Sequence, residues 1–198
     1  MYPESLKNLI ESFKFLPGIG EKTAERLAFY ILGLEKEEVD FFSESLINAK
    51  KELHGCRICN NITDNEICNI CSDDSRDSST LCILEDIKSL YMFEKSKVFN
   101  GQYHIIKNLI SPLNGINPED IGLEELLKRI KDANYKEIII AVKPSIEGET
   151  TSLYIKRILE GLDIKVSRIA SGIPMGADME YIDSLTLERA IVDRKELE

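Results

Sequence analysis

Apolar residues recur at helical spacing through the first 53 residues of the chain. Their positions, three and four apart, predict a helix over residues 5–15, a second over residues 21–32 and a third over residues 36–53. The segment Leu16-Pro17-Gly18-Ile19-Gly20 separates the first two helices, because proline and glycine interrupt a helical pattern. The sequence therefore begins with a helical hairpin, followed by a third helix.

A different pattern starts after a polar linker at residues 72–79, where short apolar runs alternate with amphipathic segments. The apolar runs predict strands and the amphipathic segments predict helices. This alternation is typical of a mostly parallel α/β sheet. The expected strands lie at residues 81–84, 98–106 (with a turn signal at Asn100-Gly101), 137–142 and 165–169, and the expected helices at residues 87–95, 123–131, 150–159 and 184–194.

A cysteine motif lies between these two patterns. Its spacing is Cys-x2-Cys-x8-Cys-x2-Cys, formed by Cys56, Cys59, Cys68 and Cys71. Two such knuckles can turn four thiolates toward one point, which predicts a closed tetrahedral site for one structural Zn²⁺. Two disulfides are the alternative, but no apolar signal segment precedes the first helix, and a reducing compartment favours metal. The fifth cysteine, Cys82, lies in an apolar run and is expected in the core.

The charge balance bears on which partners the chain can bind. The formal net charge is −10 at pH 7, which argues against a nucleic-acid partner. The excess of acids begins after residue 34, however, and the first 33 residues carry as many bases as acids. No apolar stretch is long enough to span a bilayer, so we expect no membrane contact and a cytoplasmic location. Neither a phosphate-binding loop nor a Ser-His-Asp arrangement is evident, and the isolated His54 and His104 are interpreted as structural.

The hairpin between the first two helices has the form of a helix-hairpin-helix element. Gly18 and Gly20 permit a tight turn, after which the free N–H groups of the second helix can meet a phosphate. Lys22 and Arg26 are four residues apart on one helix face and can contact neighbouring phosphates. This arrangement predicts DNA binding without base specificity. An ordinary helical hairpin with a solvated lysine and arginine is the alternative, and the neighbouring zinc module favours DNA.

Three glutamates follow predicted strands. Glu85 comes after the strand 81–84, and Glu147 and Glu149 lie in a predicted loop at residues 142–149. Because the carboxyl ends of parallel strands share one edge of a sheet, these carboxylates are candidates for a Mg²⁺ site. The alternative is that Glu147 and Glu149 only place negative charge at the start of a helix.

The order of these parts resembles the RecR family of bacterial recombination mediators. The resemblance rests on seven blocks that cover almost the whole chain: residues 16–28, the four cysteines, and residues 70–73, 103–104, 111–120, 147–150 and 172–181. It implies an α/β protein with a helix-hairpin-helix domain (1–53), a four-cysteine zinc finger (54–76), a Toprim domain (79–171) and a C-terminal helical segment for subunit contacts (172–198).

The same resemblance implies a function in DNA repair. Members of the family form dimeric or tetrameric rings or clamps, and act with RecO and RecF to load RecA onto gapped DNA coated with single-strand-binding protein. Lys22 and Arg26 match positions that the family uses against DNA. Glu85 and the segment around Glu147 match an acidic Toprim surface that the family uses mainly for partners.

One departure from the Toprim pattern bears on catalysis. Catalytic Toprim domains carry an Asp-x-Asp-x-Asp series, which here falls on Lys143, Ser145 and Glu147. A lysine ammonium offers no lone pair and repels a divalent cation, and two-metal cleavage needs a carboxylate cage. We therefore expect a mediator that is not an enzyme. A Mg²⁺-dependent Toprim nuclease or primase-like enzyme using the three glutamates remains the alternative. Ala177 also departs from the family, which usually has glycine there.

Overall fold

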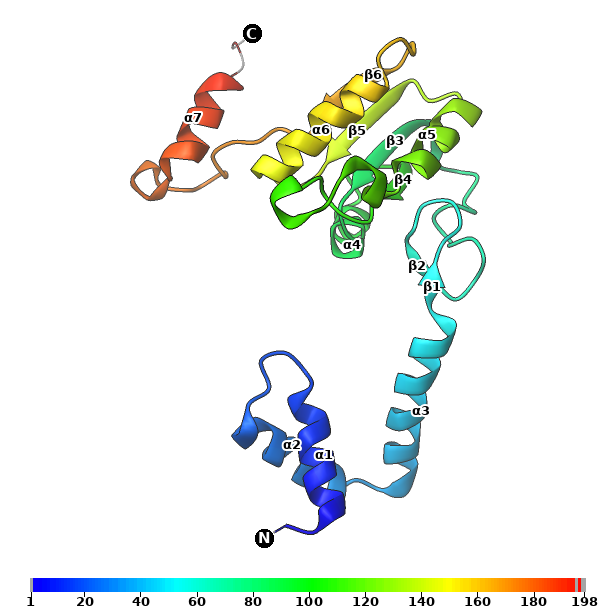
Figure 1. Ribbon diagram of the computed structural model, residues 1–198, viewed down its shortest axis with the longest axis vertical. Helices are drawn as coiled ribbons and strands as arrows, with labels where there is room; N and C mark the ends of the chain where they lie inside the picture. The colour runs from blue at the N-terminus through cyan, green and yellow to red at the C-terminus, as the bar shows by residue number, and fades with distance from the viewer. Residues whose placement is uncertain (1, 195, 197–198) are drawn as a thin grey trace. The chain divides into compact units, whose positions relative to one another are not determined.

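The computed structural model describes residues 2–194 and 196, and it divides into two compact units (Figure 1). Met1, Lys195, Leu197 and Glu198, at the outer ends of the first and last predicted domains, lie outside the described residues. The first unit is residues 1–53 and the second is residues 54–198. No helix in the described part of the chain has the length and apolar character that crossing a bilayer requires.

The first unit is entirely helical. It contains α1 (Glu4–Lys14), α2 (Glu21–Leu32) and α3 (Lys36–Glu52). Its buried core joins α1 to α2 through Ile10, Ala24 and Ala28. The two alanines carry only a methyl group, so the two helices approach closely at these positions. In contrast, α3 buries none of its residues, and Phe41, Phe42, Leu46 and Ile47 are exposed along it.

The second unit opens with a two-stranded antiparallel ribbon that carries the cysteine motif. Its strands are β1 (His54–Gly55) and β2 (Ile62–Thr63). A four-stranded parallel sheet follows in the order β4-β3-β5-β6. Its elements are β3 (Asp77–Leu84), α4 (Ile87–Ser96), β4 (Gly101–Ile105), the short 3-10 helices η1 (Pro112–Asn114) and η2 (Pro118–Ile121), α5 (Leu123–Asp132), β5 (Glu137–Ala141), α6 (Ile146–Ile158), β6 (Lys165–Arg168), η3 (Met179–Tyr181) and α7 (Ser184–Val192).

Alternating side chains of β3 divide the sheet into two apolar faces. Leu81 and Ile83 pack in a cluster with residues of α5 and α6, whereas Cys82 and Leu84 pack in a second cluster with Leu90 of α4. Helices therefore cover both faces, as a parallel sheet requires. The pattern confirms the predicted α/β fold class, and Cys82 is fully buried as expected.

The register of the sheet sets which loops meet. Leu84 of β3 pairs with Ile105 of β4 on one side and with Ala141 of β5 on the other. The three strands therefore end at one edge of the sheet, where Glu85 and the segment after β5 emerge. This is the shared edge that the sequence predicted.

Several element boundaries differ from the sequence prediction. β3 starts at Asp77 rather than 81, within the predicted polar linker, because Asp77 pairs with Gly101 of β4 and its backbone N–H donates to the carbonyl of Asn100 (2.9 Å). The Asn100-Gly101 signal lies at the start of a single parallel strand, β4. The helix expected from residue 150 starts at Ile146, so Glu147 and Glu149 lie in its first turn and not in a loop.

The early start of α6 has a local cause. The Ser145 hydroxyl accepts a hydrogen bond from the backbone N–H of Gly148, which is a side-chain N-cap. Gly148 is buried against the preceding loop, and a Cβ at this position would collide with the carbonyl oxygen of Lys143. The final helix ends at Val192, two residues earlier than predicted.

Candidate functional site

The four cysteines converge as a metal site requires. Their Sγ atoms all lie within 4.8 Å of one another, and all five cysteines of the chain are free thiols rather than disulfides. Cys56, Cys59 and Cys68 are buried, and Cys71 is partly buried. Four sulfur ligands without an open position suit structural Zn²⁺, so the predicted ligand set fits the ion.

Backbone N–H groups around the cysteines favour the thiolate form that zinc needs. Cys56 Sγ accepts from the N–H groups of Ile58 (3.5 Å) and Cys68 (3.3 Å), and Cys59 Sγ accepts from Asn61 (3.4 Å). Burial opposes ionisation of Cys56, but these donors outweigh it and lower the pKa to about 7. The pKa of Cys59 is raised by its neighbour Cys71 and by burial. Zinc must therefore displace protons when it binds, which makes metal affinity fall at low pH.

The first zinc knuckle is bonded to the edge strand of the sheet. The backbone N–H of Ile105 donates to the carbonyl of Cys59 (2.8 Å), and the Asn60 side chain donates back to the carbonyl of Ile105 (2.9 Å). Asn60 has a φ of 63°, in the left-handed region, and its side-chain bond helps to hold it there. The zinc module is thus continuous with the sheet at the end of β4.

Arg129 of α5 forms a second tie between the zinc module and the sheet, one that the sequence did not reveal. Its guanidinium donates to the carbonyl oxygens of Tyr103 (2.6 Å) and Ile58 (3.3 Å), and to the side chain of Gln102 (2.9 Å). His104 Nδ1 also lies 3.3 Å from the Ile58 carbonyl. This imidazole is buried, which together with the Arg129 charge lowers its pKa to about 4. His104 is therefore a buried imidazole beside the zinc module, and its structural role stays a prediction.

The helical hairpin has the turn that its glycines predicted. The backbone N–H of Ile19 bonds to the carbonyl of Leu16 (3.1 Å), with Pro17 second in the turn and Gly18 third at a φ of 82°. This is the geometry of a type II turn, which needs a positive φ at its third residue. Gly20 is the N-cap of α2 and provides no side-chain cap. The first backbone N–H groups of α2 are therefore not capped by a side chain of that residue.

Charged side chains surround this helix end. Lys22 and Arg26 are exposed in the first two turns of α2, four residues apart. Lys14 of α1 contacts Glu11 (2.8 Å) and Glu21 (2.7 Å), so it bridges the two helices of the hairpin. The Lys14 bridge offsets the negative charge of Glu21 at the start of α2. The sequence did not reveal this bridge.

The three glutamates at the sheet edge have different surroundings. The Oε2 atom of Glu85 is buried and accepts no hydrogen bond from the described residues. The pKa of Glu147 is lowered by its own backbone N–H, by the Ser145 hydroxyl and by the charge of Lys143. Glu147 thus carries its negative charge at the N-terminus of α6, where the helix dipole favours it.

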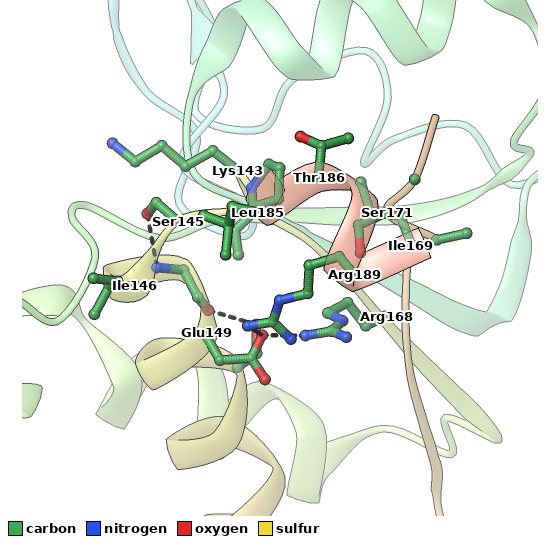
Figure 2. Close-up of a pocket in the computed structure, with 16 residues that line it drawn as sticks. Lys143, Ser145, Ile146, Glu149, Arg168, Ile169, Ser171, Leu185, Thr186 and Arg189 are labelled. Carbon is green, nitrogen blue, oxygen red and sulfur yellow. Dashed lines mark hydrogen bonds and ion pairs between the residues drawn. The ribbon is translucent and has the colours of Figure 1, made fainter. Parts of the chain in front are cut away.

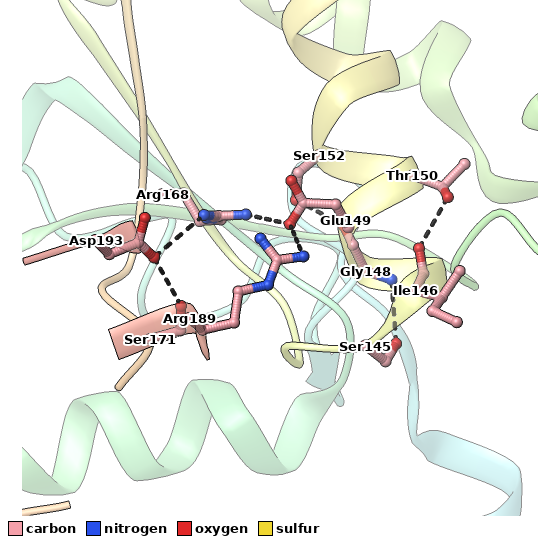
Figure 3. A network of polar contacts seen from close by, with 10 residues as sticks. All are labelled: Ser145, Ile146, Gly148, Glu149, Thr150, Ser152, Arg168, Ser171, Arg189 and Asp193. Atoms are coloured by element: carbon pink, nitrogen blue, oxygen red, sulfur yellow. Dashed lines mark hydrogen bonds and ion pairs between the residues drawn. The ribbon is translucent and has the colours of Figure 1, made fainter. Parts of the chain in front are cut away.

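Glu149 points toward β6 and α7, where two arginines occupy it (Figure 3). Arg168 at the end of β6 donates to Glu149 Oε2, and Arg189 of α7 lies 3.6 Å from the same oxygen. These residues line a cavity of about 340 Å³ between the start of α6, the end of β6 and α7 (Figure 2). In Figure 2 the Lys143 ammonium extends away from Glu149.

This geometry fits Mg²⁺ poorly. Lys143 occupies the first of the three expected acidic positions, and Glu149 is already bound by two guanidinium groups. Only Glu85 and Glu147 remain of the predicted carboxylates, fewer than a two-metal site requires. The donor set is therefore suited to zinc at the cysteines and poorly suited to magnesium at the sheet edge.

Four protein-family models match successive parts of the chain. The model described as RecR, helix-hairpin-helix matches residues 6–50, and the RecR model of a four-cysteine zinc finger domain matches residues 56–73. A Toprim domain model matches residues 79–170, and the model described as RecR, C-terminal matches residues 172–195. The matches follow one another in the order in which the helical hairpin, the cysteine motif, the parallel sheet and α7 occur.

Proposed function

Because the chain belongs to the RecR family of recombination proteins, we propose that it is a DNA-binding repair mediator that encircles or clamps DNA as a ring. In this proposal it acts in the cytoplasm with RecO, and with RecF, to promote RecA loading on gapped DNA coated with single-strand-binding protein. We propose four domains with the bounds expected from the sequence: residues 1–53, 54–76, 79–171 and 172–198.

The proposal of DNA binding rests on the helical hairpin. Helix α2 starts directly after the turn at Gly18 and Gly20. Its N-cap residue, Gly20, has no side chain that could cap the first N–H groups of the helix. Lys22 and Arg26 are exposed on the same helix. Backbone N–H groups and two cations at one helix end suit phosphate oxygens and read no bases. We therefore propose these four residues as the DNA contact.

The test of this contact is a double variant, Lys22→Ala/Arg26→Ala. Fluorescence anisotropy on gapped DNA is expected to show weaker binding, with a salt dependence shallower by about 1 to 2 units in log–log slope. Lys50→Ala/Lys51→Ala, in the last turn of α3, removes the same charge elsewhere on the first unit and is the matched control. Equal losses in the two variants would show a general charge effect and remove the hairpin from the proposal.

The exposed apolar side chains of α3 support the ring. A 53-residue unit that leaves two phenylalanines, a leucine and an isoleucine exposed on one helix carries a large unpartnered apolar surface. We propose that a second copy of the chain covers it. The C-terminal segment would supply another subunit contact.

We also propose that the Toprim domain binds partners and does not cleave DNA. Support comes from Lys143 in the acid series and from the two arginines on Glu149. Glu85 and Glu147, with Glu149, would form the acidic surface for RecO. A nicking assay on gapped plasmid with Mg²⁺ or Mn²⁺ tests this proposal. Metal-dependent nicking that disappears in Glu147→Gln would establish the nuclease function instead.

A further inference from the structure

Helix α7 is attached to the Toprim domain by a small network of charges (Figure 3). Glu149 of α6 receives Arg168 from the end of β6 and Arg189 from the middle of α7. At the end of α7, Asp193 lies 3.6 Å from the Arg168 guanidinium and accepts a hydrogen bond from the Ser171 hydroxyl (3.1 Å). Two points of α7, one turn apart, are thus fixed to the same arginine–glutamate pair.

Apolar packing adds little to this attachment. No residue of α7 is buried, and Leu185, Ile191 and Val192 are all more than half exposed. The charged side chains of the network are themselves 31% to 40% exposed, so water and salt weaken their attraction. A helix held in this way is poised to leave its docked position.

The network also occupies one of the three glutamates of the acidic surface. Both arginines meet the same carboxylate oxygen of Glu149, and Arg189 reaches it only while α7 is docked. A basic side chain from a partner would have to displace Arg189 to contact that oxygen. Docking of α7 therefore competes with a partner for the Oε2 atom of Glu149.

We propose that α7 is a reversible lid over Glu149, and that the docked lid lowers the affinity of the acidic Toprim surface for a partner that presents lysines or arginines. This inference rests on the proposed function, in which that partner is RecO. A partner that binds only the open form has its affinity reduced by the fraction of molecules that are open. Loosening the lid therefore tightens partner binding without adding any contact.

Arg189→Ala is the direct test. The variant loses one of the two pairs on Glu149, and an exposed ion pair of this kind changes an equilibrium by at most about fivefold. We expect purified RecO to bind Arg189→Ala about twofold to fivefold more tightly than the wild type by titration calorimetry. Arg194→Ala is the matched control. It removes the same charge just after α7, but the Arg194 side chain donates to the Ile191 carbonyl and not to the network around Glu149. Its affinity should equal that of the wild type, and equal gains in both variants would overturn the lid.

A second variant separates the lid from a simple change in surface charge. Removing Arg189 makes the surface more negative, which by itself attracts a basic partner. Asp193→Asn makes the surface less negative but also unfastens α7 from Arg168 and Ser171. The lid predicts tighter RecO binding in Asp193→Asn as well. Weaker binding in this variant, beside tighter binding in Arg189→Ala, would reduce the effect to charge alone.

Hydrogen exchange measures the lid without any partner. The backbone N–H groups of residues 184–192 should exchange faster in Arg189→Ala, Asp193→Asn and Glu149→Gln than in the wild type or Arg194→Ala. Unchanged exchange in these variants would overturn the lid even if RecO binding changed. If exchange rises as expected while RecO binds neither wild type nor variants, the lid stands and the partner assigned under the proposed function is wrong.

Discussion

Arg76 connects the start of β3 to α4 and to β4 through its guanidinium group. It lies in the polar run predicted as a linker, yet its side chain is only 8% exposed and pairs with Glu94 at 3.0 and 2.8 Å. It also donates to the carbonyl of Gly101 (2.9 Å) and lies over the ring of Tyr103, whose hydroxyl bonds Glu94. A linker arginine and a helix glutamate 18 positions apart give no local signal that they meet.

Replacing Arg76 by leucine should destabilise the second unit by about 2–4 kcal/mol, because Glu94 and the Gly101 carbonyl would lose their partner while remaining partly buried. The midpoint of urea unfolding measures the change. Lys165→Leu breaks a pair with Glu137 in which the lysine is 71% exposed, so it serves as the control and should cost less than about 1 kcal/mol. Equal losses would contradict the role given to Arg76.

His104 should make stability depend on pH. Its pKa is lowered to about 4 in the folded chain, below the ordinary value of 6.5, because of burial and the Arg129 charge. The unfolded chain therefore takes up a proton first, and stability is lost as pH falls from about 6.5 toward 4, by at most about 1.4 kcal/mol per pH unit. His104→Asn should flatten this part of the unfolding profile relative to the wild type. An unfolding profile of unchanged slope in His104→Asn would contradict this assignment.

Residue-level prediction from sequence succeeded where chemistry is local. The four cysteines and the glycines of the hairpin turn carry their geometry in their spacing, and both were found. The partners of Glu149 were not found, because Arg168 and Arg189 reach it from 19 and 40 positions further along the chain and only the fold brings them there.

At the scale of elements, α2 was predicted with its observed bounds. The Pro-Gly turn before it and the helical spacing of its apolar residues indicate the same starting residue. The start of α6 was missed by four residues. Residues 142–149 were predicted as a loop, whereas Ser145 caps the helix and Gly148 packs closely against the backbone of Lys143.

Gly148→Ala tests that packing. The added methyl group would meet the backbone of Lys143, which cannot move aside as a flexible side chain does, so we expect a loss of about 1–3 kcal/mol or more in unfolding free energy. Thermal unfolding followed by circular dichroism measures it. Gly55→Ala, where no atom lies within 4 Å of the new Cβ, is the control. A fully stable Gly148→Ala protein would mean that α6 does not begin as described.

Zinc removal should destabilise the edge of the sheet as well as the zinc module. Structural zinc contributes on the order of 10 kcal/mol to folding its own ligand loop, and the knuckle at Cys59 holds the end of β4. After treatment with a chelator, the amide of Ile105 should exchange faster by hydrogen-exchange NMR. The amide of Ile139, in the interior strand β5, should change far less. Unchanged exchange at Ile105 would show that the knuckle is not what holds β4.

At the scale of the whole molecule, the sequence predicted the order of parts and the parallel sheet, because both follow from patterns that run along the chain. It did not predict how α7 is attached, since a helix without buried residues leaves little apolar signature of its docking site. Net charge was a poor guide as well. The net charge of −10 is a sum over the whole chain, whereas Lys22 and Arg26 are two exposed cations close together on the hairpin.

At this scale, we expect α3 to determine whether copies of the chain assemble. Phe42→Ser/Leu46→Ser removes two exposed apolar side chains from that helix and leaves the α1–α2 core intact. If a second copy covers these side chains, light scattering should show a smaller assembly for the double variant than for the wild type at equal concentration. Lys50→Ala/Lys51→Ala on the same helix should not change the mass. An unchanged mass in Phe42→Ser/Leu46→Ser would place the subunit contact elsewhere.

The zinc knuckle and two partly buried arginines together protect the outer side of β4. In this strand the carbonyls of Gly101, Tyr103 and Ile105 accept bonds from Arg76, Arg129 and Asn60 respectively. Without such partners, the edge of a sheet is a template on which another chain can add a strand and begin to aggregate. These side chains thus close the edge against strand addition, and because Asn60 belongs to the zinc knuckle, we expect zinc removal to expose the end of this edge.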